Sequence, residues 1–380
     1  MRKFRAVFMR GGTSKGLIFR REDLPEDQRD WDSIFLQAMG NPDVKQIDGL
    51  GGTVSSNNKI VVVWRSEKEG VDVEYLVGQV VVGKDQVDYK ANCGNMTSAV
   101  GPFALDEGLV QPSGDLMTVR LFNKNTDKKI DVSFPLRDGR FALEGNCKIA
   151  GIDGTAAEIK VNFLDPAGAK TGCLLPTGKQ REILDVPGVG KIDVSIIDIS
   201  GPFIMVNADD IGLEGIETPE EINSNAETCE KLEKIRGLAA CTIGMACDME
   251  DASANSPALP KIGVCSIPKR YKDLSGRTVD TTEMDLLVRV MSVFKCHKAS
   301  PLTAACAIAG MAVIDGTIPN SLMKRQVPET GEIPIRIAHP SGVMTMYADL
   351  QLSGGKPFIA GVAAQRTSRR IMDGTVYIRK

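Results

Sequence analysis

The sequence is poor in aromatic residues and histidine, and it has no excess of charge of one sign. Aromatic residues make up 5% of the 380 residues, and the formal net charge is −3. Lysine and arginine are spread along the chain and do not gather in clusters. Proteins that bind single-stranded nucleic acid usually combine a basic groove with aromatic rings on which the bases stack. The composition therefore argues against a nucleic-acid partner.

Patterns that hold metals or nucleotides are also missing. The nine cysteines form no Cys-x-x-Cys pair, and the only histidines are His297 and His339. Zinc sites are usually built from cysteine and histidine at short spacings. The glycine-rich turn RGGTSKG, residues 10–16, lacks the spacing of a P-loop. We therefore expect neither a metal nor another cofactor.

Long hydrophobic runs are absent as well. The first residues, MRKFRAVFMRGGTSKG, contain no apolar run of the kind found in secretory signals. No segment reaches the roughly 20 apolar residues that a membrane-spanning helix needs. We expect a cytoplasmic protein without a membrane partner, whose cysteines are reduced thiols.

What the sequence does contain is a repeated order of elements. Residues 5–25 and 193–212 share a strand, a turn of small residues, an apolar strand and an acidic pair. Residues 297–318 parallel the segment that begins at Asn92, a polar turn followed by a helix of small and apolar residues. Such repetition predicts two similar units, which suits a chain too long for one small core.

We therefore predict an α+β protein with two pseudo-symmetric domains. Each would be a curved β-sheet or barrel wrapped around one central apolar helix, with the active site in a cleft between the domains. The boundary is placed near the turn PGVGK, giving domains of residues 1–187 and 188–380, with a C-terminal tail that can return to the first domain.

Three helices stand out. One is predicted over residues 28–39, closed by Gly40, and a charged amphipathic one over residues 218–240. A third follows Cys93 and is apolar nearly all round, as in a helix enclosed by a sheet. Pro102 lies inside it, so we expect a kink or a break there.

The stretch NCGNMTSAVGPFAL, residues 92–105, places a cysteine at the mouth of that helix. The amides of Asn95, Met96 and Thr97 would then be free to bind an anion such as a substrate carboxylate. The helix dipole would also favour the thiolate form of Cys93. Filling space in a core is the usual role of an isolated cysteine, but this polar turn favours a functional one.

Two further candidates precede that helix in the sequence. Lys59 stands between the polar residues SSNN and the hydrophobic strand IVVVW. A lysine at the end of a buried strand can point into a cleft, where loss of hydration favours the neutral amine that acts as a base. An ordinary solvated lysine is the alternative. Ser14, on the turn RGGTSKG, is predicted to bind a carboxylate together with backbone amides.

The second half offers a comparable set in HKASP. His297, Lys298 and Ser300 precede the predicted helix, and Thr303 lies in its first turn. We predict that these four residues bind substrate, with His297 either an acid/base group or a cap. Cys306 follows on a mostly apolar face and is interpreted as part of the core.

Seven motifs between residues 6 and 378 together resemble one family. They are MRGGTSKG, QIDGLGG, NCGNMTSAVGPFA, SGPFIMV, HKA before an alanine-rich helix, HPSG and RTSRRIMDGTVYI. This combination resembles the PrpF family, a branch of the diaminopimelate epimerase-like fold. The resemblance covers nearly the whole chain, and no single motif carries it.

The resemblance implies a cofactor-independent isomerase. Such an enzyme moves a C=C bond by a 1,3-allylic proton shift in an unsaturated di- or tricarboxylate, of the 3-methylitaconate or 2-methylaconitate type. The family's acid/base pair, a lysine on an early strand and the cysteine of NCGN, corresponds to Lys59 and Cys93. Epimerases of this fold begin their second central helix with another cysteine, whereas this chain has HKASP there.

Several alternatives remain open from the sequence. A 4-oxalomesaconate tautomerase would belong to the same family. An amino-acid racemase or epimerase would need a second well-placed thiol, and a non-catalytic carboxylate-binding partner protein would need none. The sequence also leaves open whether Lys59 or Cys93 takes the first proton, and whether the chain forms a homo-oligomer.

Overall fold

The structure, a computed structural model, describes residues 1–89 and 92–379. Its elements form two compact units, Met1–Leu164 with Gln365–Lys380, and Asp165–Ala364. The turn PGVGK, at which the sequence placed a domain boundary, instead joins β10 (Glu182–Val186) to β11 (Gly190–Asp198) in an antiparallel hairpin. It therefore lies inside the second unit, because hairpin partners share one sheet.

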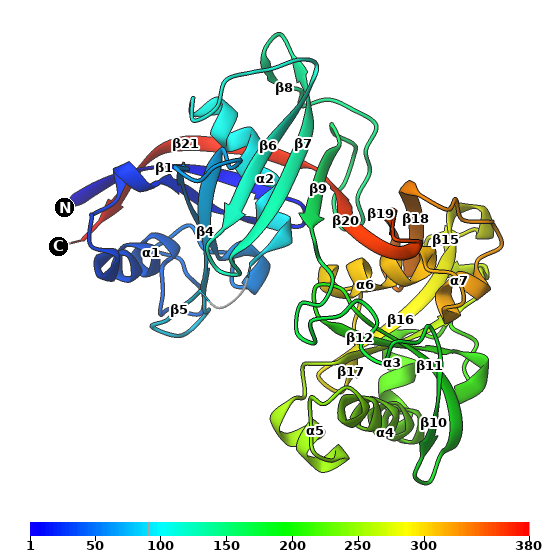
Figure 1. Ribbon diagram of the computed structural model, residues 1–380. Coiled ribbons are helices and arrows are strands. Elements are labelled where there is room, and N and C mark those ends of the chain that lie inside the picture. Colours follow the sequence, from blue (N-terminus) through cyan, green and yellow to red (C-terminus); the bar gives the residue numbers. More distant parts are fainter. Residues whose placement is uncertain (90–91, 380) are drawn as a thin grey trace. The chain divides into compact units, whose positions relative to one another are not determined.

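The first unit is built on eight principal strands, whose alternating or continuous runs of Val, Ile and Phe favour extended backbone. They are β21 (Ser368–Ile378), β1 (Arg2–Gly11), β2 (Ser14–Arg20), β3 (Lys59–Arg65), β4 (Val73–Val80), β6 (Leu116–Asn123), β7 (Lys128–Arg137) and β9 (Ile159–Leu164), in order of pairing. The pairs β2–β3 and β4–β6 are parallel, and the others are antiparallel. Figure 1 shows β21, from the end of the chain, alongside β1.

The second unit repeats this arrangement. After β10 and β11 come β12 (Pro202–Asn207), β13 (Lys261–Ser266), β16 (Leu286–Ser292), β18 (Gly331–His339), β19 (Gly342–Ser353) and β20 (Lys356–Arg366). Here β12–β13 and β16–β18 are the parallel pairs, at the same places in the order. Two similar units with the same sequence of parallel and antiparallel pairs confirm the predicted fold class.

Parallel strands need a crossover connection, usually a helix, and every parallel pair here has one. The helices are α1 (Trp31–Met39) and α2 (Gly94–Asp106) in the first unit, and α3 (Pro219–Ser224), α4 (Ala226–Thr242), α5 (Met249–Asn255), α6 (Leu302–Val313) and α7 (Ile318–Leu322) in the second. Thus α2 connects β4 to β6, and α6 connects β16 to β18 (Figure 1).

Short elements complete the chain. They are the strands β5 (Val87–Asp88), β8 (Arg140–Phe141), β14 (Tyr271–Lys272), β15 (Thr278–Val279) and β17 (Lys295–Cys296), and the 3-10 helices η1 (Arg21–Asp23), η2 (Gln28–Asp30), η3 (Ser55–Asn57), η4 (Asp209–Ile211) and η5 (Thr281–Glu283). Within the described ranges, no helix is long and apolar enough to cross a membrane.

One helix prediction needs correction, and of the kink or break expected at Pro102 the break does not occur. The helix predicted over residues 218–240 is divided into α3 and α4 because Asn225 leaves the helical conformation, and its side chain caps α4 by accepting from the Thr228 amide. The helix after Cys93 runs through Pro102 without a break. Proline removes one N–H from a helix, and burial of α2 from Met96 to Leu105 holds the remaining turns in place.

The core of the first unit explains why α2 is apolar all round. Alternate residues of β3 face opposite sides of the sheet. Val61 and Val63 pack with α2, whereas Ile60 and Val62 pack with α1. Both faces of β3 are therefore covered, and α2 is enclosed within the unit. In the second unit α6 is buried from Ala304 to Val313 in the same way.

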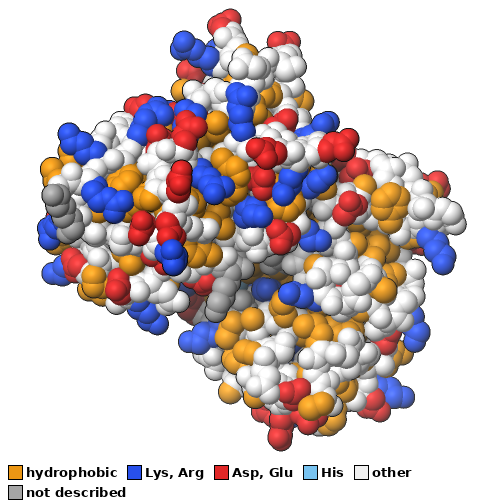
Figure 2. All heavy atoms as spheres, turned by 60° about the vertical axis from the view of Figure 1, so that its left-hand side comes forward, with side chains coloured by type: hydrophobic (Ala, Val, Ile, Leu, Met, Phe, Trp, Pro, Cys, Tyr) orange, Lys and Arg blue, Asp and Glu red, His pale blue; other side chains and the backbone are white. Residues whose placement is uncertain are grey.

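Most charged side chains lie at the surface, although a few, such as Arg289 and Asp198, are buried. On the face shown in Figure 2, Lys and Arg side chains are interspersed with Asp and Glu. This mixture agrees with the even distribution of charge along the sequence.

Gly16 gives a direct test of how closely β2 and β3 approach. It pairs with Lys59, and a Cβ at Gly16 would lie 1.9 Å from the Lys59 carbonyl oxygen. We expect Gly16→Ala to lower the free energy of unfolding by about 1–3 kcal/mol, because the backbone must shift. Gly374→Ala is the matched control, since β21 leaves open space there. It should be neutral or stabilise by about 0.5–1 kcal/mol. Urea denaturation followed by circular dichroism measures both, and equal effects would contradict the close approach.

Candidate active site

The helix α2 begins directly after Cys93, as predicted. Cys93 has an extended backbone (φ −115°, ψ 97°), and its side chain makes no capping hydrogen bond. The Cys93 carbonyl accepts from the Thr97 amide at 2.9 Å. The Thr97 amide is therefore engaged by the helix itself. The amides of Asn95 and Met96, in the first turn, have no partner inside a helix of this kind.

The turn Gly11–Ser14 packs against this helix start. A Cβ at Gly11 would lie 2.4 Å from the Asn95 carbonyl oxygen, so only glycine allows the approach. The Asn95 side-chain amide donates to Thr13 Oγ1 at 3.0 Å and to Ser14 Oγ at 3.4 Å. Ser14 is buried. The structure thus brings Ser14 and Asn95 together, as the two predictions required.

Two arginines that sequence reasoning missed lie near this helix start: Arg366 at the end of β20 and Arg10 on β1. Arg366 Nε donates to Asn95 Oδ1 at 3.1 Å. Arg10, half-buried, donates from Nη1 to the Gly12 carbonyl at 2.8 Å and to Thr367 Oγ1 at 3.0 Å. Burial, with a contribution from nearby Arg369, lowers the pKa of Arg10. The motif RTSRR was visible in the sequence, but nothing local connected it to Asn95, 271 positions away.

Behind the helix start, Thr97 serves as support. Its side chain is buried, 2.9 Å from the Tyr75 hydroxyl oxygen, and it donates to Asn92 Oδ1 at 3.2 Å. Burial strongly raises the pKa of Tyr75, so its hydroxyl stays protonated. Thr97 therefore has no free donor for substrate: its amide donates to the Cys93 carbonyl, and its hydroxyl bonds to Tyr75 and Asn92. The Met96 side chain is also fully buried, which leaves only its amide for a ligand.

Lys59 is the first residue of β3 and is half-buried. Its backbone pairs with Gly16, two residues after Ser14, and its Nζ donates to Gln79 Oε1 on β4. Since Ser14 also contacts Asn95, the start of β3 lies at the same edge of the unit as the start of α2. Cys93 is half-buried and packs against the core around α2.

The second-unit candidates follow β17 in the segment that leads to α6. His297 is exposed, and its Nδ1 lies 2.9 Å from the Ala299 amide, which stabilises the turn. Lys298 Nζ is 3.9 Å from Glu220, an exposed pair that contributes little to stability. Thr303 is exposed. Ser300 is 5% exposed, and its hydroxyl has no hydrogen-bond partner among the described residues.

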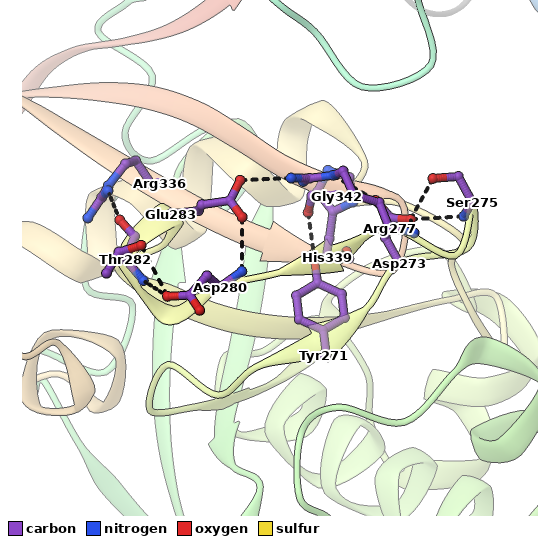
Figure 3. Close-up of polar contacts among 10 residues, drawn as sticks. All are labelled: Tyr271, Asp273, Ser275, Arg277, Asp280, Thr282, Glu283, Arg336, His339 and Gly342. Atoms are coloured by element: carbon purple, nitrogen blue, oxygen red, sulfur yellow. Dashed lines mark hydrogen bonds and ion pairs between the residues drawn. The ribbon is translucent and has the colours of Figure 1, made fainter.

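The turn between β18 and β19 supports this segment. Figure 3 shows the Tyr271 hydroxyl directed at the turn between β18 and β19, where it donates to the carbonyls of His339 at 2.7 Å and Gly342 at 3.0 Å. Ser341, in the same HPSG turn, donates to the Lys298 carbonyl. The HPSG motif therefore anchors the HKAS segment.

Charged groups around Tyr271 hold the hairpin β14–β15 (Figure 3). Burial alone would raise the pKa of Asp273, but hydrogen bonds from Ser275 and Arg277 lower it below its usual value. Arg277 also pairs with Glu283 at 2.8 Å. These ion pairs stabilise the loop near neutral pH and add no group to the candidate site.

Metal ligands are not assembled in the part of the chain that the structure describes, since no group of three or more His, Cys, Asp or Glu residues lies close enough to hold an ion. Cys306 is 1% exposed inside α6, in agreement with its interpretation as part of the core.

Comparison with known proteins identifies the class. A solved structure described as methylitaconate-delta-isomerase superposes with a TM-score of 0.91 at 39% identity, covering 99% of this chain and 96% of that one. The 3-methylitaconate isomerase of Eubacterium barkeri is 40% identical over 98% of this chain and 97% of its own length. The 2-methyl-aconitate isomerase of Shewanella oneidensis is 37% identical over 100% and 97%. The fold is therefore that of an isomerase.

The family follows from the same comparison. The match to the PrpF protein family covers residues 1–379. The chain belongs to the PrpF family.

Thiol reactivity tests whether Cys93 lies in a site for carboxylates. In the native protein, iodoacetamide should modify Cys93 and exposed Cys173 and spare Cys265 and Cys296, because burial protects both of these thiols and raises the pKa of Cys296 to about 11. An unsaturated dicarboxylate such as citraconate should slow the modification of Cys93 alone. Peptide mapping by mass spectrometry measures each rate, with Cys173 as the internal control. Unchanged modification of Cys93 at saturating citraconate would contradict a carboxylate site beside it.

Proposed function

We propose that the protein moves a C=C bond in an unsaturated di- or tricarboxylate by a 1,3-proton shift, with Lys59 and Cys93 as the acid/base pair. One observation carries the proposal. Two side chains able to transfer protons lie at the edge of the first unit where the free amides of α2, Ser14 and Arg366 also gather.

The same edge suits a carboxylate. The start of a helix favours an anion because its amides point outward and the helix dipole is positive there. Ser14 Oγ can donate a hydrogen bond, and the charge of Arg366, held by Asn95, adds attraction. These donors are fixed before substrate arrives, so they need not reorganise during the reaction.

The reaction removes a proton from the carbon between the double bond and a carboxylate. The electron pair left behind spreads through the conjugated carboxylate as a dienolate. A proton added at the far end of the allyl system then completes the shift, and no atom is gained or lost. One of Lys59 and Cys93 removes the first proton, and the other supplies the second.

Electrostatic stabilisation must do most of the work. General acid–base catalysis contributes about 10²–10⁴-fold, whereas an intermediate with an extra negative charge beside carboxylates is poorly stabilised in water. Amides and cationic side chains aimed at the developing charge address this difficulty. The proposed chemistry requires no metal or organic cofactor.

A second anion site is expected at α6. The buried hydroxyl of Ser300 precedes the helix, and His297, Lys298 and Thr303 lie close to it along the chain. We propose that these residues bind a carboxylate.

Relatives guide the choice of substrate. They include a 3-methylitaconate isomerase, a 2-methyl-aconitate isomerase and a 4-oxalomesaconate tautomerase that is 35% identical. We propose 3-methylitaconate or 2-methylaconitate as the substrate type and the tautomerase reaction as the alternative. A two-thiol racemase is disfavoured because Cys306 is buried inside α6.

Proton NMR in D₂O tests the reaction. With 3-methylitaconate we expect the double bond to move and deuterium to enter the new methyl group, because the second proton comes from an exchangeable group. Lys59→Ala and Cys93→Ser should each slow the reaction by about 10²–10⁴-fold. Cys173→Ser, which changes an exposed thiol, is the control and should leave the rate unchanged.

The same assay separates the alternatives. Aconitate isomers, 2-methylaconitate and 4-oxalomesaconate rank the substrates when each is offered in turn. If deuterium were exchanged into the substrate without movement of the double bond, the result would contradict the proposal and indicate a racemase-like activity. Full activity of both variants would remove Lys59 and Cys93 from the mechanism.

A further inference from the structure

We propose that Gln79 is the positioning residue of Lys59, and that a buried network of side-chain amides from the loop before β3 holds Gln79 in place. The inference rests on the proposed role of Lys59 in proton transfer. It gives a purpose to the QIDGLGG motif, residues 46–52, which the proposed function leaves unused.

The first observation is a row of side chains across three strands. Lys59 pairs with Gln79 on β4, and Gln79 pairs with Asp88 on β5. Residues directly opposite each other on neighbouring strands point to the same face of the sheet. Gln79 therefore lies between Lys59 and Asp88, and its Oε1 accepts a hydrogen bond from Lys59 Nζ.

The second observation is that the Gln79 amide is oriented by its other contacts. Its Nε2 donates to the Asn58 carbonyl at 3.1 Å and to the Val80 carbonyl at 2.8 Å. An amide nitrogen has two hydrogens, and both are used. A flipped amide would place its oxygen against two carbonyls, so Oε1 is directed at Lys59.

The third observation is the network behind it. Asn58 and Gln46 are 0% and 2% exposed. Gln46 Nε2 donates to Asn58 Oδ1, and Gln46 Oε1 accepts from the Thr53 amide at 2.8 Å. Asn58 Nδ2 donates to the Val54 carbonyl at 3.0 Å. A Cβ at Gly51 would lie 2.4 Å from the Gln46 amide, which accounts for glycine in the motif.

The network is uncharged, and this matters for a group that must gain and lose a proton. A carboxylate in place of Gln79 would favour the ammonium form of Lys59 and oppose proton removal by it. On the elements packed against this end of β3, β2 presents Gly16 and Ser14, and η3 is uncharged. Among the described residues there, the titratable groups are Asp88 on β5 and Cys93 at the start of α2.

The test compares Gln79→Glu and Gln79→Leu with Gln86→Glu, which adds the same charge at an exposed position of the β4–β5 turn. The measurement is the pH dependence of kcat and KM in the isomerase assay. Gln79→Glu should move one limb of the profile to higher pH by about 1–3 units, because an adjacent opposite charge stabilises the ammonium. Gln86→Glu should leave both limbs in place.

Gln79→Leu removes the hydrogen-bond acceptor without adding charge. We expect no shift to higher pH, a KM within about twofold of the original, and a kcat lowered by about 10²-fold, the size of effect that a displacement of about 1 Å can have. If Gln79 had only a structural role, its substitution would lower the urea concentration at the unfolding midpoint. The pH dependence of kcat and KM, measured on the folded protein, would then be unchanged. Gln79→Glu has nearly the same shape as the original residue, so it keeps the test available if Gln79→Leu does not fold.

Two results would overturn the inference. One is a profile of Gln79→Glu that coincides with the original, and the other is an equal shift in Gln86→Glu. Failure of the proposed function would be seen separately, because in that case Lys59→Ala would retain activity. An inactive Lys59→Ala combined with an unshifted profile of Gln79→Glu would reject the positioning role alone.

Discussion

An apolar helix enclosed by a sheet determines where polar residues can lie in each unit. The parallel pairs β4–β6 and β16–β18 require crossovers, and α2 and α6 supply them from inside the apolar cores. Such a helix cannot present polar side chains along its length without leaving them buried. Its first turn is the place where polar groups reach the edge of the unit. The candidate residues of NCGN and HKAS accordingly lie at or just before the starts of these helices.

The strand that pairs with β1 in the first unit and the one that pairs with β11 in the second come from different parts of the chain, and this difference affects the candidate site. In the second unit β10 precedes β11 along the chain, whereas in the first unit the matching position beside β1 is filled by β21 from the C-terminus. Arg366 and Thr367 enter the site just before this strand, beside the turn Gly11–Ser14. The site in the first unit thus needs both ends of the chain. A truncation after Gln365 would remove β21, a wall of the core, together with Arg366, a cation of the site.

The parts of the site that the sequence predicted are those set by local chemistry. A cysteine flanked by asparagines and glycine before an apolar run predicted where α2 begins, and the strand pattern predicted that Lys59 lies at a strand end. Contacts made through folding were not predictable: Arg366 reaches Asn95 across 271 positions, and Gln79 reaches Lys59 through strand register. The Thr97 amide was expected to be free, but it donates to the Cys93 carbonyl, because Cys93 is itself the N-cap residue of α2. The division of the predicted helix 218–240 into α3 and α4 depends on a single N-cap residue, Asn225.

The polar groups around Lys59 also fit the charge of the proposed substrate. An acidic partner for Lys59 would form a strong ion pair, but it would hold the proton on the amine and repel incoming carboxylates. Gln79 and Ser14 supply hydrogen bonds without negative charge, and Arg10 and Arg366 add positive charge near the helix start. Asp88 stands one position further along the row, beyond Gln79. Placing an amide next to the amine and the acid one strand away holds the Lys59 side chain by a hydrogen bond without pairing it with a negative charge, as the proposed role of Lys59 requires.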